Sequence, residues 1–333
     1  MTDFTFNPFD DATRRDPAPL FARARREHPV YRHPEFPIVS LFKHGDIQGV
    51  LRDPETWSNR FPPPPGVDPA KMPEPSMLGQ DPPNHTRLRG LVSQAFTPRI
   101  IRRLEPRMHE IAAELMEHAL GQDTVDFVEA MTYPLPVIVI AEIIGVPSAD
   151  REQFKAWSDS AVADLGTGLF VAPDAQRLER LGHLFSEMGE YFSALADERR
   201  RQPREDLLTG LVQAEVEGSH LSRDEMLTML VLLLVAGNET TTSLIGNAVL
   251  ELIAHPDQQA RLRADASLLP TAIDEVLRFS SPVQLDPRRA TRRVELRGEV
   301  IEPNQLVVSW LGSANRDENV FADPDRNWWE VTA

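Results

Sequence analysis

The sequence contains no cysteine in its 333 residues. This absence excludes disulfide bonds, zinc–thiolate sites, iron–sulfur clusters and thiolate-ligated haem within these residues. An excess of basic residues is also lacking, because 35 Lys and Arg stand against 51 Asp and Glu and the formal net charge is −16. Such a chain repels nucleic-acid phosphates and anionic lipid surfaces, so neither is an expected partner.

Segments that direct a chain to a membrane are lacking as well. Residues 1–14 have no basic start followed by an apolar stretch, so no signal peptide is predicted and a cytoplasmic location is expected. The most apolar window, residues 226–237, is shorter than the ~20 residues that a membrane-spanning helix needs. A short helix that is apolar on all sides is typical of the centre of a large soluble domain. A hydrophobic content of 41% supports one large core, so a single domain is expected.

Hydrophobic spacing and capping residues predict a mainly α protein with a minor β portion. Pro106 is expected to divide one of the helices. Ser222 and Glu225 form a capping box at the start of the longest helix, and His255 followed by proline ends it. Helices are expected over residues 17–28, 45–52, 84–95, 98–120, 135–144, 148–165, 174–201, 206–216, 222–254 and 270–279.

Short strands and one long loop complete the expected organisation. Residues 61–75 contain four consecutive prolines and three more, which predicts a loop without regular structure. Long loops in compact domains are often functional. Strands are expected over residues 29–33, 36–42, 293–296, 299–301 and 306–310.

The middle of the longest helix, residues 236–242, changes abruptly from apolar to polar. Glu239 and three threonines follow Gly237, and burying such groups is costly unless they are paired or used. Thr240 can donate to the carbonyl of Ala236, which would bend the axis and open a groove for a diatomic ligand. Glu239 and Thr240 would then form a proton relay at its edge. The alternative is that the helix simply emerges into solvent here.

Two further patterns place charged residues on one face of a helix. His85 and Arg89 are four residues apart, so both could reach one anionic group, although a solvated basic face is the commoner use of this spacing. Glu275 and Arg278 are three residues apart in an apolar helix. Such a pair usually lies on the surface; if buried, it would be a structural clasp that needs further partners.

Residues 288–291, which begin with Arg288 and Arg289 in the β-rich portion, are the fourth candidate. One of these arginines could point inward to a ligand, or the segment could be a basic turn that contacts only water. A helical carboxylate-bridged metal enzyme is disfavoured, because no two long helices carry inward Glu-x-x-His pairs.

The order and spacing of these patterns resemble the bacterial cytochrome P450 family over nearly the whole chain. The family's helix beside the haem resembles residues 81–89, DPPNHTRLR, followed by AFTP. Its oxygen-binding motif resembles residues 236–241, AGNETT, and its Glu-x-x-Arg pair resembles Glu275 and Arg278. The segment that follows in the family resembles ANRD and FADPD, within residues 314–325.

The resemblance implies the cytochrome P450 fold and a haem b cofactor. In that fold His85, Arg89 and Arg288 would bind the haem propionates. Glu275 and Arg278 would be a folding element.

The implied reaction is a monooxygenation. Two electrons from a ferredoxin-type partner would split oxygen, and one atom would enter a hydrophobic small molecule. Glu239 and Thr240 would be the catalytic acid–alcohol pair, and Ala236 and Gly237 would form the oxygen groove. The elements expected around the substrate are the loop 61–80, the helices around 162–172, the longest helix and the stretch near Val283.

The chain departs from the family pattern in one respect. In the family, the Asp-Pro-Asp stretch leads to a loop Phe-x-x-Gly-x-x-x-Cys-x-Gly, whose cysteine is the axial ligand of the iron, whereas residues 327–333, NWWEVTA, do not resemble that loop. The sequence therefore predicts an incomplete P450-like domain over residues 1–326, truncated or frameshifted or from a pseudogene, that binds haem poorly. The alternative function is a non-catalytic remnant that serves as a binding or interaction protein, or has no function.

Overall fold

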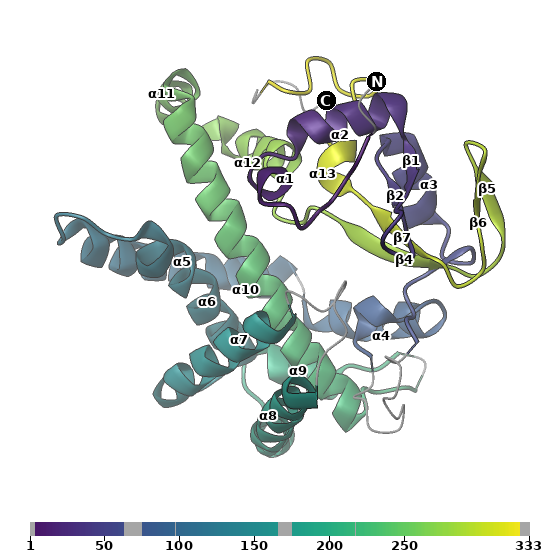
Figure 1. The fold of residues 1–333 in the computed structure, drawn as a ribbon. Helices are drawn as coiled ribbons and strands as arrows, with labels where there is room; N and C mark the ends of the chain where they lie inside the picture. Colours follow the sequence, from purple (N-terminus) through teal and green to yellow (C-terminus); the bar gives the residue numbers. More distant parts are fainter. Residues whose placement is uncertain (1–3, 63–74, 97, 166–174, 217, 327–333) are drawn as a thin grey trace. The chain divides into compact units, whose positions relative to one another are not determined.

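The computed structural model describes residues 4–62, 75–96, 98–165, 175–216 and 218–326 (Figure 1). The chain forms two compact units: unit 1 contains Met1–Phe61 and Asn247–Ala333, and unit 2 contains Pro62–Gly246. Unit 1 therefore unites both ends of the chain. The expectation of a single domain stays a prediction, and most of the predicted proline-rich loop and the whole tail 327–333 lie outside the described residues.

The five-stranded sheet of unit 1 has the order β1-β2-β7-β4-β3. Strands β2 and β7 are parallel and the other neighbours are antiparallel, so an N-terminal strand lies beside a C-terminal one. A separate antiparallel pair joins β5 to β6. The bounds are β1 Val30–Arg32, β2 Ile38–Leu41, β3 Trp57–Ser58, β4 Asp286–Ala290, β5 Val294–Leu296, β6 Glu299–Ile301 and β7 Leu306–Ser309.

Strands β3 and β4 are the elements of this sheet that the sequence did not predict. Pro287 lies within β4 and pairs with Val308 of β7. Strand β3 reaches β4 only at Arg289 and Ala290, so β4 has one strand neighbour at the position of Pro287. A proline is tolerated at such a half-paired position because no ladder hydrogen bond needs its missing N–H.

Among the helices of unit 1, α13 packs against α2 and α3 (Figure 1). Helix α11 was not predicted, because Pro256 was interpreted only as the end of the longest helix. Pro256 is the first residue of α11, a position where its missing N–H has no helical partner to lose. The bounds are α1 Asp11–Arg15, α2 Ala18–Glu27, α3 His44–Arg52, α11 Pro256–Ala264, α12 Leu269–Phe279 and α13 Leu311–Ala314.

Unit 2 is helical around one apolar core. Phe154, Met188, Leu208 and Leu230, from four different helices, are among its fully buried members. The helices are α4 Asn84–Ala95, α5 Pro98–Leu120, α6 Pro134–Ile144, α7 Arg151–Leu165, α8 Ala175–Arg201, α9 Leu207–Gln213 and most of α10 Arg223–Ala254, with a π-helical turn η3 at Val128–Thr132.

The prediction that Pro106 divides its helix is wrong. Helix α5 runs unbroken from Pro98 to Leu120 with Pro106 inside it. The proline removes only the bond to the carbonyl of Arg102, which lies on an exposed turn where water can replace it.

Helix α10 begins with the predicted capping box. The backbone N–H of Glu225 donates to Ser222 Oγ at 3.1 Å, and the N–H of Ser222 donates to the Glu225 carboxylate at 2.9 Å. By length and composition alone α10 could cross a membrane, a test that the core helix of a soluble protein also passes. Its first half packs Met226, Leu230 and Leu234 into the core of unit 2, as a core helix does.

Candidate active site

The polar motif at the middle of α10 lies on an exposed face of the helix. Ala236 and Glu239 are exposed and Thr240 is half-buried. Thr240 Oγ1 donates to the carbonyl oxygen of Ala236 at 2.6 Å, which confirms the predicted bond. The helix therefore presents a carboxylate and a hydroxyl beside a residue with almost no side chain.

The opposite face of the same turn is anchored in unit 2 by Asn238, whose side chain is fully buried. Asn238 Nδ2 donates to Ser158 Oγ of α7 at 2.7 Å. Thr242 Oγ1 lies 3.0 Å from the carbonyl oxygen of Thr132 in η3 and 3.2 Å from Asn238 Oδ1. Asn238 and Thr242 thus hold α10 to α7 and η3 at this point. Asn238 is the last fully buried residue of the helix, so the interpretation that the helix emerges into solvent here stays open beside the catalytic one.

Gly237 allows a close approach between α10 and α6. A Cβ atom at Gly237 would lie 2.7 Å from Ile140 Cδ1, well inside van der Waals contact. The bare side of this glycine is therefore filled by Ile140. The proposed oxygen groove depends instead on the exposed side of Ala236.

Helix α4 carries the two candidate propionate ligands of unit 2. Leu88, Leu91 and Val92 face the core, while His85 is half-buried and Arg89 is exposed. Within the described part of the chain, neither the imidazole of His85 nor the guanidinium of Arg89 has a hydrogen-bond or ion-pair partner. Both side chains are therefore available to an anion, as the spacing predicts.

A neighbouring arginine of α4 has a different task. Arg87 forms an ion pair with Glu225 at the start of α10 and donates to Asn84 Oδ1 at 2.9 Å. The contact lowers the pKa of Glu225 against the opposing effect of its burial. Arg87 thus fixes α4 to the first turn of α10, a role that the sequence did not reveal.

Arg288 of unit 1 lies in strand β4, so the interpretation as a solvent-exposed basic turn is wrong. Its guanidinium forms an ion pair with Asp286 at 2.6 Å. Burial raises the pKa of Asp286, and the positive charge of Arg288 opposes that effect. A propionate at Arg288 would therefore compete with, or share, an existing carboxylate partner.

Glu275 and Arg278 form a buried pair in α12, so the alternative of a surface pair is wrong. Their exposed fractions are 0% and 7%. Arg278 Nε and Nη2 donate to the two carboxylate oxygens of Glu275 at 2.7 and 2.8 Å. The clasp has the further partners that a buried pair requires.

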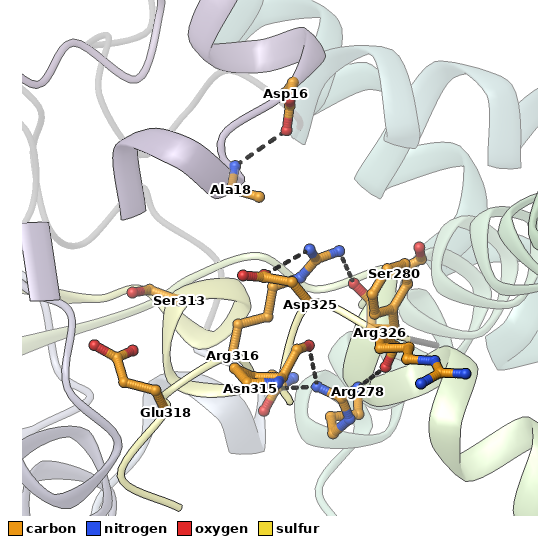
Figure 2. Close-up of polar contacts among 12 residues, drawn as sticks. Asp16, Ala18, Arg278, Ser280, Ser313, Asn315, Arg316, Glu318, Asp325 and Arg326 are labelled. Atoms are coloured by element: carbon orange, nitrogen blue, oxygen red, sulfur yellow. Dashed lines mark hydrogen bonds and ion pairs between the residues drawn. The ribbon is translucent and has the colours of Figure 1, made fainter. Parts of the chain in front are cut away.

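Those partners are backbone carbonyls of the segment after α13. Figure 2 shows Arg278 donating to the carbonyls of Asn315 and Arg326, and it also donates to Pro324 at 3.0 Å. The same view shows the contact of Arg316 with Asp325, which is 3.2 Å long. The guanidinium of Arg316 also lies 3.9 Å from the ring centroid of Phe279. The ANRD and FADPD segments are therefore fixed to α12 from both sides.

The elements expected around a substrate are only partly described. Val283 is exposed by 43%, and its carbonyl accepts a hydrogen bond from Ser281 Oγ at 2.9 Å. Residues 63–74 and 166–174, which include most of the loop and the end of the helical segment expected there, lie outside the described residues. The substrate pocket thus stays a prediction.

Each unit holds one group of the predicted residues. Unit 2 contains the α4 pair and the α10 motif, whereas unit 1 contains Glu275, Arg278, Val283 and Arg288. Unit 1 also contains a buried Arg25, which sequence reasoning missed: it donates to Glu318 at 2.9 Å and to the carbonyl of Ser313 at 3.0 Å. Among the residues that the structure describes, no group of three or more His, Asp or Glu side chains could hold a metal ion.

The chain matches the sequence profile of the Cytochrome P450 family over residues 29–326. It belongs to the cytochrome P450 family. It is 41% identical over 310 residues to Cytochrome P450 109 of Bacillus spizizenii, covering 93% of this chain and 74% of that protein. It is 38% identical over 319 residues to the Vitamin D(3) 25-hydroxylase of Pseudonocardia autotrophica, covering 94% of this chain and 76% of that protein.

Solved P450 structures share the fold. Cytochrome P450 CYP109Q5 from Chondromyces apiculatus superposes with a TM-score of 0.86 at 41% identity, covering 96% of this chain and 80% of that one. CYP109E1 from Bacillus megaterium, in complex with testosterone, gives a TM-score of 0.83 at 33% identity, covering 98% of this chain and 82% of that one. The mainly α fold with a minor β portion is confirmed.

Haem b is the cofactor of this family, and the chain fits it in part. Within the described residues His85 and Arg89 have no partner, so they would suit a propionate, and the exposed Ala236 with the Thr240 hydroxyl would suit a small ligand. The 333 residues include no cysteine, so a thiolate for the iron is not among the groups that they supply. Haem ligated by a thiolate activates oxygen by donating electron density to the iron.

Proposed function

We propose that this chain carries the distal and propionate-binding parts of a P450 monooxygenase that hydroxylates a hydrophobic small molecule. The observation that supports the proposal is the exposed face of α10, where Thr240 Oγ1 is held 2.6 Å from the carbonyl of Ala236 beside the exposed Glu239. The proposal includes a ferredoxin-type electron donor and a cytoplasmic location.

In this proposal the two polar side chains move protons. Glu239 is exposed, so its carboxylate can exchange a proton with solvent. The hydroxyl proton of Thr240 is directed at the Ala236 carbonyl, and a ligand beside Ala236 would compete for it over a short distance. His85 and Arg89 would orient the cofactor through its propionates.

A polypeptide of these 333 residues would not by itself form thiolate-ligated haem, since it contains no cysteine. We therefore expect it to bind haem poorly and to be inactive or impaired as a monooxygenase. Haem titration followed by a carbon monoxide difference spectrum tests this expectation. A stable thiolate-type spectrum would contradict it.

The names of relatives suggest the substrate class. One relative is a Vitamin D(3) 25-hydroxylase, and one similar structure holds testosterone. We propose steroid-sized apolar molecules as the first substrates to test.

A chimera tests the monooxygenase proposal directly. Residues 1–326 are joined to the ligand-loop portion of Cytochrome P450 109, and the product is assayed with a ferredoxin, its reductase and testosterone or vitamin D3. The expected result is a thiolate-type carbon monoxide spectrum and a hydroxylated product. A chimera that binds haem through its thiolate and forms no hydroxylated product from any apolar substrate would contradict the proposal.

A further inference from the structure

Asn238 is a polar residue at the end of the buried stripe with which α10 faces the core of unit 2. Val231 and Leu234 precede it at the spacing i, i+3, i+7, and all three side chains are buried, with exposed fractions of 5%, 0% and 0%. One turn later the half-buried Thr242 lies on the same side of the helix. A single polar residue in such a stripe specifies the register of helix packing, because only one arrangement satisfies its hydrogen bonds.

We infer that Asn238 is a positioning residue, whose bond to Ser158 of α7 fixes the rotation of α10 and thereby presents Ala236 and Thr240 on the opposite face. The inference rests on the proposed function only in assigning a use to that face. The rotation itself is a property of the polypeptide without cofactor.

The partners of Asn238 come from two directions. Its Nδ2 donates to Ser158 Oγ at 2.7 Å, which ties α10 to α7. Its Oδ1 lies 3.2 Å from Thr242 Oγ1. The one hydroxyl hydrogen of Thr242 is shared between this oxygen and the carbonyl oxygen of Thr132, which is 3.0 Å from Thr242 Oγ1. The carboxamide is thus bonded on both its nitrogen and its oxygen side in this arrangement.

Helix geometry turns this anchor into a statement about the exposed face. Residues advance by about 100° along an α-helix, so a residue two positions away points to nearly the opposite side. Ala236 and Thr240 both stand two positions from Asn238. Ala236 is exposed and Asn238 is fully buried, as this relation requires.

A rotation of α10 about its axis would break the hydrogen bond between Asn238 and Ser158. Asn238 would leave Ser158, and a buried carboxamide would lose its partners, at the free-energy penalty of an unsatisfied polar group. An apolar residue at the same position would impose no such penalty. The chain would then keep its core but lose the device that selects one rotation.

The absence of cysteine makes a direct test possible, since one introduced thiol is then the only one in the chain. Ala236→Cys reports the exposed face and Val231→Cys reports the buried stripe. Reaction with an aromatic disulfide reagent measures both on the cofactor-free chain. With Asn238 and Ser158 unchanged, the thiol at position 236 should react about a hundredfold or more faster than the thiol at position 231. The reason is that the buried thiol reacts only after the protein opens locally.

Asn238→Leu and Ser158→Ala are then added to each reporter. We expect the rate at position 236 to fall about twofold or more and the rate at position 231 to rise about tenfold. Destabilisation alone opens the protein and can only raise thiol rates, so a fall at position 236 is specific to rotation. The double variant Asn238→Leu with Ser158→Ala should change the rates no further than either alone, because the two side chains act through one bond.

Ser160→Ala is the matched control on α7. Ser160 is exposed, and its hydroxyl donates to the carbonyl of Ala156 in its own helix at 2.9 Å, so both rates should stay unchanged. An unchanged rate at position 236 in Ser158→Ala and Asn238→Leu would overturn the inference. If Asn238→Leu does not fold, Ser158→Ala, which removes a single hydroxyl, decides alone. Because no haem is present, this failure is distinct from a chimera that forms no product.

Discussion

Arg278 donates two hydrogen bonds to the two carboxylate oxygens of Glu275, at 2.7 and 2.8 Å, in the interior of unit 1. The remaining guanidinium hydrogens reach the carbonyls of Asn315, Pro324 and Arg326. One side chain therefore holds α12 to carbonyls that follow 37 to 48 residues later along the chain.

Removing one partner of this clasp should strongly destabilise unit 1. Arg278→Ala leaves the Glu275 carboxylate buried without a counter-ion, and we expect the free energy of unfolding to fall by about 3–5 kcal/mol. Arg278→Lys should recover only part of this loss, because an ammonium group cannot bind both carboxylate oxygens and the carbonyls at once. Urea unfolding followed by tryptophan fluorescence measures both.

Asp197 and Arg200 provide the matched control for the clasp. They have the same order and spacing as the buried pair, but their side chains are 60% and 50% exposed. Arg200→Ala should change the free energy of unfolding by less than about 0.5 kcal/mol. Equal losses for Arg200→Ala and Arg278→Ala would show that burial is not the source of the stabilisation.

The sequence predicted the helices well because their signals are local. Caps, hydrophobic spacing and prolines located α4 and the two ends of α5 to the residue, and the start of α10 to within one residue. Burial is different, because it depends on segments that are distant in the sequence. Whether Glu275 and Arg278 lay on the surface or inside could not be decided from their spacing, since the Asn315 and Arg326 carbonyls that enclose Arg278 come from elsewhere.

In the candidate site, too, the local features were predicted and the contact between distant segments was not. The motif at Ala236, Glu239 and Thr240 was found from its residue types, and so was its internal hydrogen bond. The anchor at Asn238 was missed, although a lone polar residue at i+7 of an apolar stripe was a usable signal. Its partner Ser158 lies 80 residues away and no local pattern points to it.

Gly237 offers a test of the close packing between α10 and α6. Gly237→Ala places a Cβ atom 2.7 Å from Ile140 Cδ1, so strain should offset the better helix propensity of alanine and leave stability nearly unchanged. In an Ile140→Val background the clashing methyl is gone. There Gly237→Ala should stabilise the chain by about 0.5–1 kcal/mol, measured as a shift in the urea midpoint.

Gly246 is the control for this effect, because it lies in the same helix and a Cβ atom there meets nothing within 4 Å. Gly246→Ala should stabilise by a similar amount whether residue 140 is isoleucine or valine. If Gly237→Ala is as favourable with Ile140 as with valine, the contact between the two helices is not tight.

Arg89 should contribute to cofactor affinity in the chimera that carries a ligand loop. Its guanidinium has no partner within the described part of the chain, and a charge-assisted hydrogen bond to a carboxylate is worth roughly tenfold or more in affinity. Arg89→Gln should therefore weaken haem binding about tenfold, measured by titrating the cofactor-free chimera. Arg102→Gln, which removes an exposed arginine of α5, is the control and should leave the affinity unchanged.

His33 should make the stability of unit 1 depend on pH. The imidazole is buried, with an exposed fraction of 6%, and its Nε2 lies 2.9 Å from Ser40 Oγ. Burial lowers the pKa of His33 to about 4 from 6.5. A histidine whose folded-state pKa lies below its unfolded value contributes stability that is full above pH 6.5 and is lost as the pH falls towards 4.

The size of that loss is bounded by the shift in pKa. At about 1.4 kcal/mol per pH unit, the contribution of His33 between pH 6.5 and 4 is at most about 3.5 kcal/mol. His33→Gln keeps a group that can bond to Ser40 but cannot titrate, so its urea midpoint should fall less steeply over this range. His183→Gln removes a histidine whose side chain is 80% exposed and should leave the slope unchanged. Parallel pH profiles for the parent and His33→Gln would mean that His33 remains neutral, or becomes charged, to the same extent in the folded and unfolded chains.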